Sequence, residues 1–91
     1  MEDYPERWAA IYARRLGEGI CWHLFRHCLA SPANVAALRE SLPPALLSDA
    51  LAAAASPEPD LTTMRQLASR LDEWLESRRR ARQAAGPTSD A

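Results

Sequence analysis

The sequence predicts an all-α protein, a compact bundle of three or four helices. Apolar residues recur at helical spacing in several segments, and Pro-containing stretches separate those segments. Alternating apolar and polar residues are absent and β-branched residues are scarce, so no strand is expected. With 91 residues, the chain is near the lower limit for folding on a hydrophobic core alone. We therefore expect one helical domain over residues 1–85 and a disordered C-terminal tail over residues 86–91.

The longest candidate helix is Glu6–Leu29, which holds two of the three Trp and all of the Cys and His residues. Its arginines fall mostly on one side and its apolar residues on the other, which is typical of an amphipathic helix. The apolar arc consists of Trp8, Tyr12, Ala13, Leu16, Ile20 and Leu24, joined by His23 and His27. Gly17 and Gly19 each cost a helix roughly 1 kcal/mol relative to Ala. We expect either a break there or the close approach of another backbone.

Three further helices follow, each after a recognisable start signal. Ser31 is a suitable N-cap for a helix over Pro32–Leu42, with proline at its first position. A second helix is expected over Pro44–Ala55. Asp60 can cap a third over Leu61–Ala84, which Gly and Pro then end. We expect the first and last helices to form the long pair, with the two short helices packed across them.

Charge and cysteine content limit the cellular setting. The formal net charge is -1, so no global field attracts the chain to nucleic acid or acidic lipid. No apolar run reaches the roughly 20 residues of a membrane span, and no signal peptide is recognisable. Two Cys without a signal peptide indicate a reducing, cytoplasmic location. In a continuous helix, Cys21 and Cys28 would lie roughly 10 Å apart, too far for a disulfide.

The end of the first segment indicates a partner-binding surface. Trp22, Phe25 and Leu29 occupy the side that carries arginines earlier in the helix, so this part is apolar nearly all round. Because the other helices are short and rich in Ala, we expect another chain to cover this second face, with Arg26 beside it. The favoured function is a small non-enzymatic protein–protein interaction module. It would be a regulatory or accessory subunit that forms a homodimer or docks on a larger protein.

Nucleic-acid binding is the first alternative. Arg78, Arg79, Arg80 and Arg82 could contact phosphates near the end of the last helix. Acidic residues precede them and no aromatic residue lies between them. A solvated helix end, favoured by the helix dipole, is therefore the simpler interpretation.

A metal or haem site is the second alternative. His23 and His27 are four residues apart, which places them side by side as half of a metal site. The two Cys lie on nearly the opposite face and the chain has no further His, so a half-buried pair at the edge of the core is the simpler interpretation. We expect no cofactor. We also predict no catalytic residues, because neither a phosphate-binding loop nor a Ser-His-Asp arrangement is present.

A small residue and an acid lie between apolar anchors in the segment Ala13–Ile20. Over about a dozen positions this pattern resembles the BH3 helices that dock in the grooves of Bcl-2 proteins. It departs from that pattern at Ala13, where BH3 helices have a large Leu. The resemblance implies that this helix itself inserts into the groove of a partner.

Overall fold

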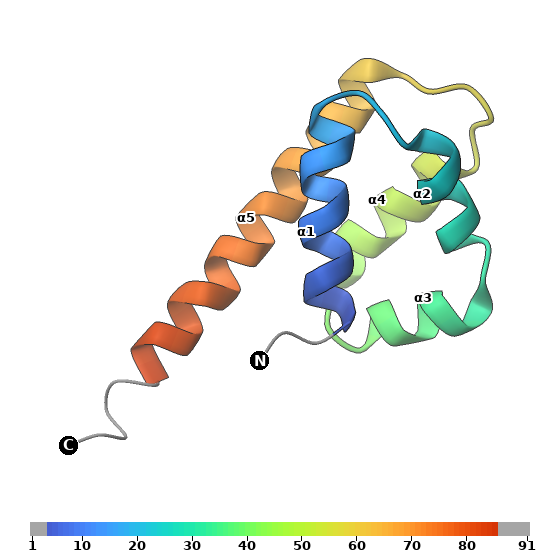
Figure 1. The fold of residues 1–91 in the computed structure, drawn as a ribbon. Helices are drawn as coiled ribbons and strands as arrows, with labels where there is room; N and C mark the ends of the chain where they lie inside the picture. Colours follow the sequence, from blue (N-terminus) through green and yellow to red (C-terminus); the bar gives the residue numbers. More distant parts are fainter. Residues whose placement is uncertain (1–3, 86–91) are drawn as a thin grey trace.

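Five helices follow one another along residues 4–85, the part of the chain that this computed structural model describes (Figure 1). They are α1 (Tyr4–Gly17), α2 (Trp22–Leu29), α3 (Pro32–Arg39), α4 (Pro44–Ala54) and α5 (Leu61–Ala85). This part of the chain contains no strand, which confirms the all-α class. The expected count of three or four helices is wrong, because the first segment forms two helices. The tail predicted over 86–91 lies outside the described residues.

The first segment breaks just after Gly17. Gly19 has a left-handed backbone with φ of 76°, and Cys21 follows with φ of 66°. The amide of Ile20 donates to the carbonyl of Arg15, and that of Gly19 to the carbonyl of Leu16, both at 3.0 Å. This pair of hydrogen bonds is the Schellman motif that ends helices at a left-handed glycine. Of the two interpretations of the glycines, the break is confirmed.

The break rotates α2 relative to α1 and changes which side chains are buried. Trp22, Phe25 and Leu29 are 4%, 0% and 6% exposed, respectively. By contrast, Ile20 and Leu24, which a continuous helix would place on the core arc, are 45% and 60% exposed. The expectation that another chain must cover Trp22, Phe25 and Leu29 is therefore wrong. These three side chains face the interior of their own domain.

The core lies between the α1–α5 pair and the three short helices (Figure 1). α1 and α5 form the most extensive helix–helix contact, as expected for the first and last helices. Phe25 joins α2 to α1, because its ring centroid lies 5.9 Å from that of Trp8 and 5.4 Å from that of Tyr12. The ring of Trp22 packs on the other side of the cluster, 5.5 Å from Phe25. This aromatic cluster positions α2 against α1.

Side chains from α2 also hold the end of α4. Arg26 donates from Nε to the carbonyl oxygen of Ala54 at 2.9 Å, and the Trp22 indole donates to the carbonyl of Ser56 at 3.2 Å. The last carbonyls of a helix lack partners within the helix, and a nearby cation stabilises them. These two bonds fix α2 at the end of α4, in addition to the ring contacts that fix it against α1.

The predicted N-caps are present. Ser31 accepts a hydrogen bond from the amide of Asn34 at 3.4 Å. Asp60 accepts from the amide of Thr63 at 3.4 Å and from its hydroxyl at 2.6 Å. The bond from the Thr63 hydroxyl lowers the pKa of Asp60. Local start signals therefore located α3 and α5 correctly.

Candidate functional site

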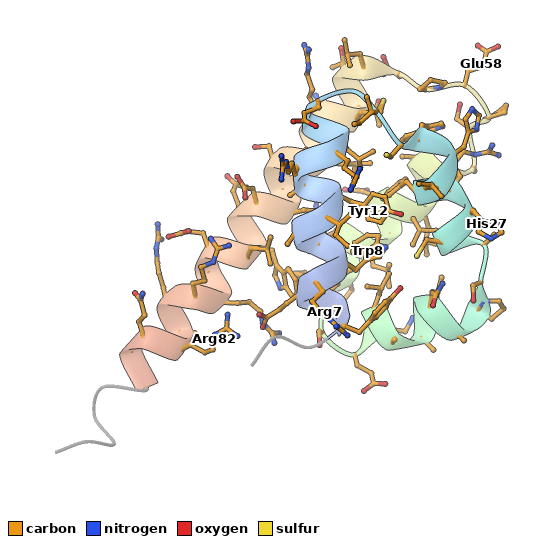
Figure 2. The ribbon with its side chains drawn as sticks, in the orientation of Figure 1. Arg7, Trp8, Tyr12, His27, Glu58 and Arg82 are labelled. Carbon is orange, nitrogen blue, oxygen red and sulfur yellow. The ribbon has the colours of Figure 1, made fainter. Side chains whose placement is uncertain are left out.

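A concave pocket lies between α1 and α2. It has a volume of about 400 Å³ and is lined by Tyr4, Arg7, Trp8, Ile11, Tyr12 and Cys28. We call it the aromatic pocket, because three of these six side chains are aromatic. Figure 2 shows Trp8 and Tyr12 on the side of α1 that faces α2. The α1 helix supplies five of the six lining residues, and α2 supplies Cys28.

The thiol of Cys28 connects the helices around the pocket. Its Sγ accepts from Trp8 Nε1 at 3.2 Å and from Asn34 Nδ2 at 3.6 Å, and it lies 3.5 Å from the hydroxyl of Tyr4. Asn34 also donates to the backbone carbonyl of Cys28 at 3.2 Å. These contacts come from α1, α2 and α3, so the pocket is held in place by three helices. Such preorganisation lowers the entropy cost of binding.

The two tyrosines of the pocket stay protonated far above neutral pH. Burial raises the pKa of Tyr4 to about 12, and its hydrogen bond with Cys28 contributes in the same direction. Burial also raises the pKa of Tyr12. Both phenols are therefore uncharged, and they present apolar rings with one hydroxyl each to the pocket.

One exposed apolar side chain lines the aromatic pocket, and a second lies on the face of α2 that carries Cys28. Ile11 lines it and is 48% exposed, although large aliphatic side chains are usually buried. Leu24 is 60% exposed and lies one helical turn before Cys28, on the same face of α2. We refer to the aromatic pocket together with Leu24 as the α1–α2 surface. A concave site with exposed apolar borders is typical of a binding surface rather than of scattered surface residues.

The side chains that were predicted to bind a partner do not form this surface. Trp22, Phe25 and Leu29 are in the core, and Arg26 is half-buried and bonded to Ala54. The sequence-based prediction did not include Ile11, because the apolar residues at the end of the segment formed the more obvious apolar surface. A signal was available, because Ile11 lies one turn after Arg7 on the side that otherwise carries arginines.

The arginines near the end of α5 divide into two pairs with different partners. Arg78 and Arg82 lie 2.8 and 2.9 Å from the carboxylate of Glu6, which is 3% exposed. Arg79 and Arg80 lie 3.4 and 3.8 Å from Glu76 on α5 itself. Nucleic-acid binding by these arginines stays a prediction; all four form ion pairs within the chain, and Arg78 and Arg82 form theirs with another helix.

The histidines are exposed on α2 instead of half-buried at the edge of the core. Within residues 4–85, no group of three or more His, Cys, Asp or Glu side chains is placed to hold a metal ion. Cys21 and Cys28 are free thiols. The segment that resembles a BH3 helix is interrupted, because α1 ends at Gly17 and Ile20 lies in the turn.

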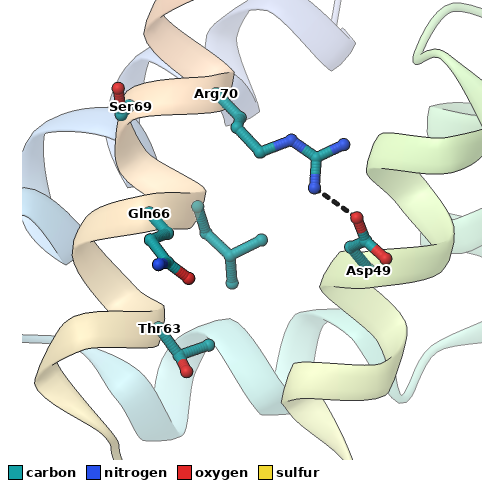
Figure 3. Close-up of a pocket in the computed structure, with 6 residues that line it drawn as sticks. Asp49, Thr63, Gln66, Ser69 and Arg70 are labelled. Atoms are coloured by element: carbon teal, nitrogen blue, oxygen red, sulfur yellow. Dashed lines mark hydrogen bonds and ion pairs between the residues drawn. The ribbon is translucent and has the colours of Figure 1, made fainter.

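A second cavity, of about 380 Å³, lies between α4 and α5 (Figure 3). Asp49 on α4 and Arg70 on α5 form an ion pair across it, and the rest of the lining comes from α5, namely Thr63, Gln66, Ser69 and the apolar Leu67. Because Asp49 already neutralises Arg70, the cavity presents little net charge to a ligand. Its lining lacks the aromatic groups and the exposed apolar border of the α1–α2 surface.

None of the helices within residues 4–85 is both long enough and apolar enough to cross a membrane. Comparison with protein-family models, with curated proteins and with solved structures finds no match. The functional assignment therefore depends on the residues of the chain itself.

Proposed function

We propose that the protein is a small, non-enzymatic interaction module that docks a protein partner on its α1–α2 surface. The main supporting observation is the aromatic pocket with the exposed side chain of Ile11 on its border. The proposed surface is a different face from the one that the sequence suggested. It retains the predicted role as a regulatory or accessory subunit.

The residue types of the pocket support protein binding. Tyr, Trp and Arg are enriched at the centres of protein interfaces, where they provide most of the binding energy. The pocket combines Tyr4, Tyr12 and Trp8 with Arg7. Its volume of about 400 Å³ can accept an apolar anchor from a partner. Phenol hydroxyls and the guanidinium group can then bond to the polar flank of that anchor.

The environment of Cys28 supports binding rather than catalysis. A nucleophilic thiol needs an adjacent base to activate it. The side chains in contact with Cys28 are those of Trp8, Asn34 and Tyr4, and none of these is a base at neutral pH. Both histidines are exposed on α2, and neither lines the aromatic pocket. These features give the thiol a structural role in joining three helices.

Site-specific photo-crosslinking in the native cells tests this proposal. A photoreactive side chain replaces Ile11 in one protein and Leu61 in a control. Leu61 is a matched position, because it is 46% exposed and does not line the aromatic pocket. We expect a discrete adduct with one protein from position 11 and none from position 61. Absence of an adduct at position 11, or equal adducts at both positions, would contradict the proposal.

A further inference from the structure

We infer that the segment that docks on the α1–α2 surface is an acidic amphipathic helix of a different protein, and not a second copy of this chain. This inference rests on the proposed docking function and adds the chemistry of the partner. The charges around the aromatic pocket and the distribution of exposed apolar side chains over residues 4–85 support it.

The exposed charges of α1 are predominantly positive. Arg7 lines the aromatic pocket, and Arg15 lies two turns further along α1, with Nη1 3.8 Å from the Sγ of Cys21. Arg14 is also exposed and lies 4.0 Å from Glu18. Glu18 follows the end of α1, and the one acid within α1, Glu6, is buried against arginines of α5 and adds no exposed negative charge. A partner with carboxylates beside its apolar residues therefore complements this surface.

A second copy of this chain fits the surface poorly. Two α1–α2 surfaces facing each other would bring Arg7 and Arg15 of both copies together, which is unfavourable. The acidic residues of α5 could meet these arginines, namely Asp72, Glu73 and Glu76. However, the exposed large apolar side chains among residues 4–85 are only Ile11, Ile20, Leu24 and Leu61. Only Leu61 is on α5, and it lies eleven residues, or about 16 Å along the helix, before Asp72, so the acidic part of α5 has no exposed large aliphatic anchor for the aromatic pocket.

The shape of the surface favours a helical segment. The described chain has no strand, so it offers no sheet edge to an extended peptide. Ile11 and Leu24 stand on two neighbouring helices with the concave pocket beside them. A groove of this kind binds the apolar stripe of an amphipathic helix, whose anchors recur three or four residues apart. Acidic residues on both sides of that stripe would face the arginines of α1.

A phage-displayed library of helical peptides tests the inference. Leucine anchors at helical spacing are kept constant, and the flanking positions are randomised. Selection uses the wild-type protein, with counter-selection on Ile11→Glu to remove peptides that bind elsewhere. We expect Asp and Glu to be enriched at the flanks. Binding of a selected peptide should weaken roughly three- to ten-fold in Arg7→Gln/Arg15→Gln and fall with added salt.

The possible outcomes separate the inference from the proposed function. If the selected peptides need Ile11 for binding but have neutral or basic flanks, the inference of an acidic partner is wrong, while the proposed docking surface is supported. Failure to recover any peptide that distinguishes wild type from Ile11→Glu would overturn both. The solution mass should be that of a monomer across a dilution series with reductant. A dimer that Ile11→Glu abolishes would show that a second copy is the occupant after all.

Discussion

The guanidinium of Arg78 on α5 lies 2.8 Å from the buried carboxylate of Glu6 on α1, across a sequence separation of 72 residues. Arg82, one turn later, lies 2.9 Å from the other carboxylate oxygen. Arg78 also lies over the ring of Trp74, at 5.0 Å from its centroid. These ion pairs tie the start of α1 to α5 near the point where α5 extends beyond the other helices (Figure 1). They therefore fix the helix that carries the aromatic pocket.

Removing these ion pairs should destabilise the fold. We expect Glu6→Gln to lower the free energy of unfolding by about 1.5–3 kcal/mol, the value of hydrogen bonds to charged groups. The Arg78→Gln/Arg82→Gln variant should lose about 3–5 kcal/mol, because it takes both guanidinium groups from a buried carboxylate. Urea unfolding followed by circular dichroism measures both values. The control Arg79→Gln/Arg80→Gln should change stability by less than about 0.5 kcal/mol. An equal loss in this control would contradict the structural role assigned to Arg78 and Arg82.

Substitutions at Trp22 and Leu24 test the rotation of α2. Trp22→Ala should cost about 3–5 kcal/mol of unfolding free energy, because it removes a buried ring and its hydrogen bond to Ser56. Leu24→Ala should cost less than about 0.5 kcal/mol, because the side chain is mostly exposed. Thermal and urea unfolding of the two variants give the comparison. If α1 and α2 formed one continuous helix with the same buried face, Leu24→Ala would reduce the free energy of unfolding more than Trp22→Ala.

The two glycines at the end of α1 should respond in opposite directions to alanine. At Gly19 a Cβ would meet Leu61 Cδ1 at 2.8 Å, and the left-handed backbone adds about 1–2 kcal/mol of strain. Gly19→Ala should therefore be destabilising. At Gly17 the nearest atom to an added Cβ is that of Ala68 at 3.6 Å, an ordinary contact. Gly17→Ala should be neutral or stabilising by up to about 1 kcal/mol through helix propensity. Equal effects at both positions in urea unfolding would contradict the observed break.

Spectrophotometric titration tests the burial of the pocket tyrosines. The chain has two Tyr, and both have a pKa above the ordinary value of 10.0 in the folded protein. We expect little phenolate absorbance at pH 10, whereas the urea-unfolded chain should be half-titrated there. The neutral phenols stabilise the fold fully below pH 10, and this contribution is lost as the pH rises through about 12. Tyr4→Phe should remove the higher transition. Half-titration of the folded protein at pH 10 would show that the tyrosines are not buried.

Local signals in the sequence were sufficient for the fold class and for most helix boundaries. Ser31 and Asp60 were recognisable caps because a helix start depends on groups within a few residues of it. Which face of α2 is buried was not predictable in the same way. It depends on left-handed backbones at Gly19 and Cys21, and a non-glycine residue seldom adopts that conformation. A helical projection continued through that turn therefore assigned Leu24 to the core and Trp22 to the outside.

The candidate site was less predictable than the fold, because its contacts join distant parts of the chain. Cys28 meets Trp8, twenty positions earlier, and Asn34 on the next helix. Glu6 is favourable in the first turn of a helix because of the helix dipole. This preference gives no reason to expect that the Glu6 side chain is buried. Its pairing with Arg78 becomes apparent only when α1 and α5 are placed side by side. Tertiary placement, rather than local preference, creates both the aromatic pocket and the ion pairs that support it.

The indole N–H signals of the three Trp residues give the most direct test of the docking surface. Trp8 lies in the aromatic pocket, whereas neither Trp22 nor Trp74 lines it. Replacing each Trp in turn with Phe assigns the signals. The signals are then followed by ¹⁵N NMR while the partner identified by crosslinking, or a peptide selected from the library, is added. We expect the Trp8 signal to shift and the other two to stay nearly unchanged. A shift of Trp22 or Trp74 with an unchanged Trp8 would place docking elsewhere and contradict the proposed function.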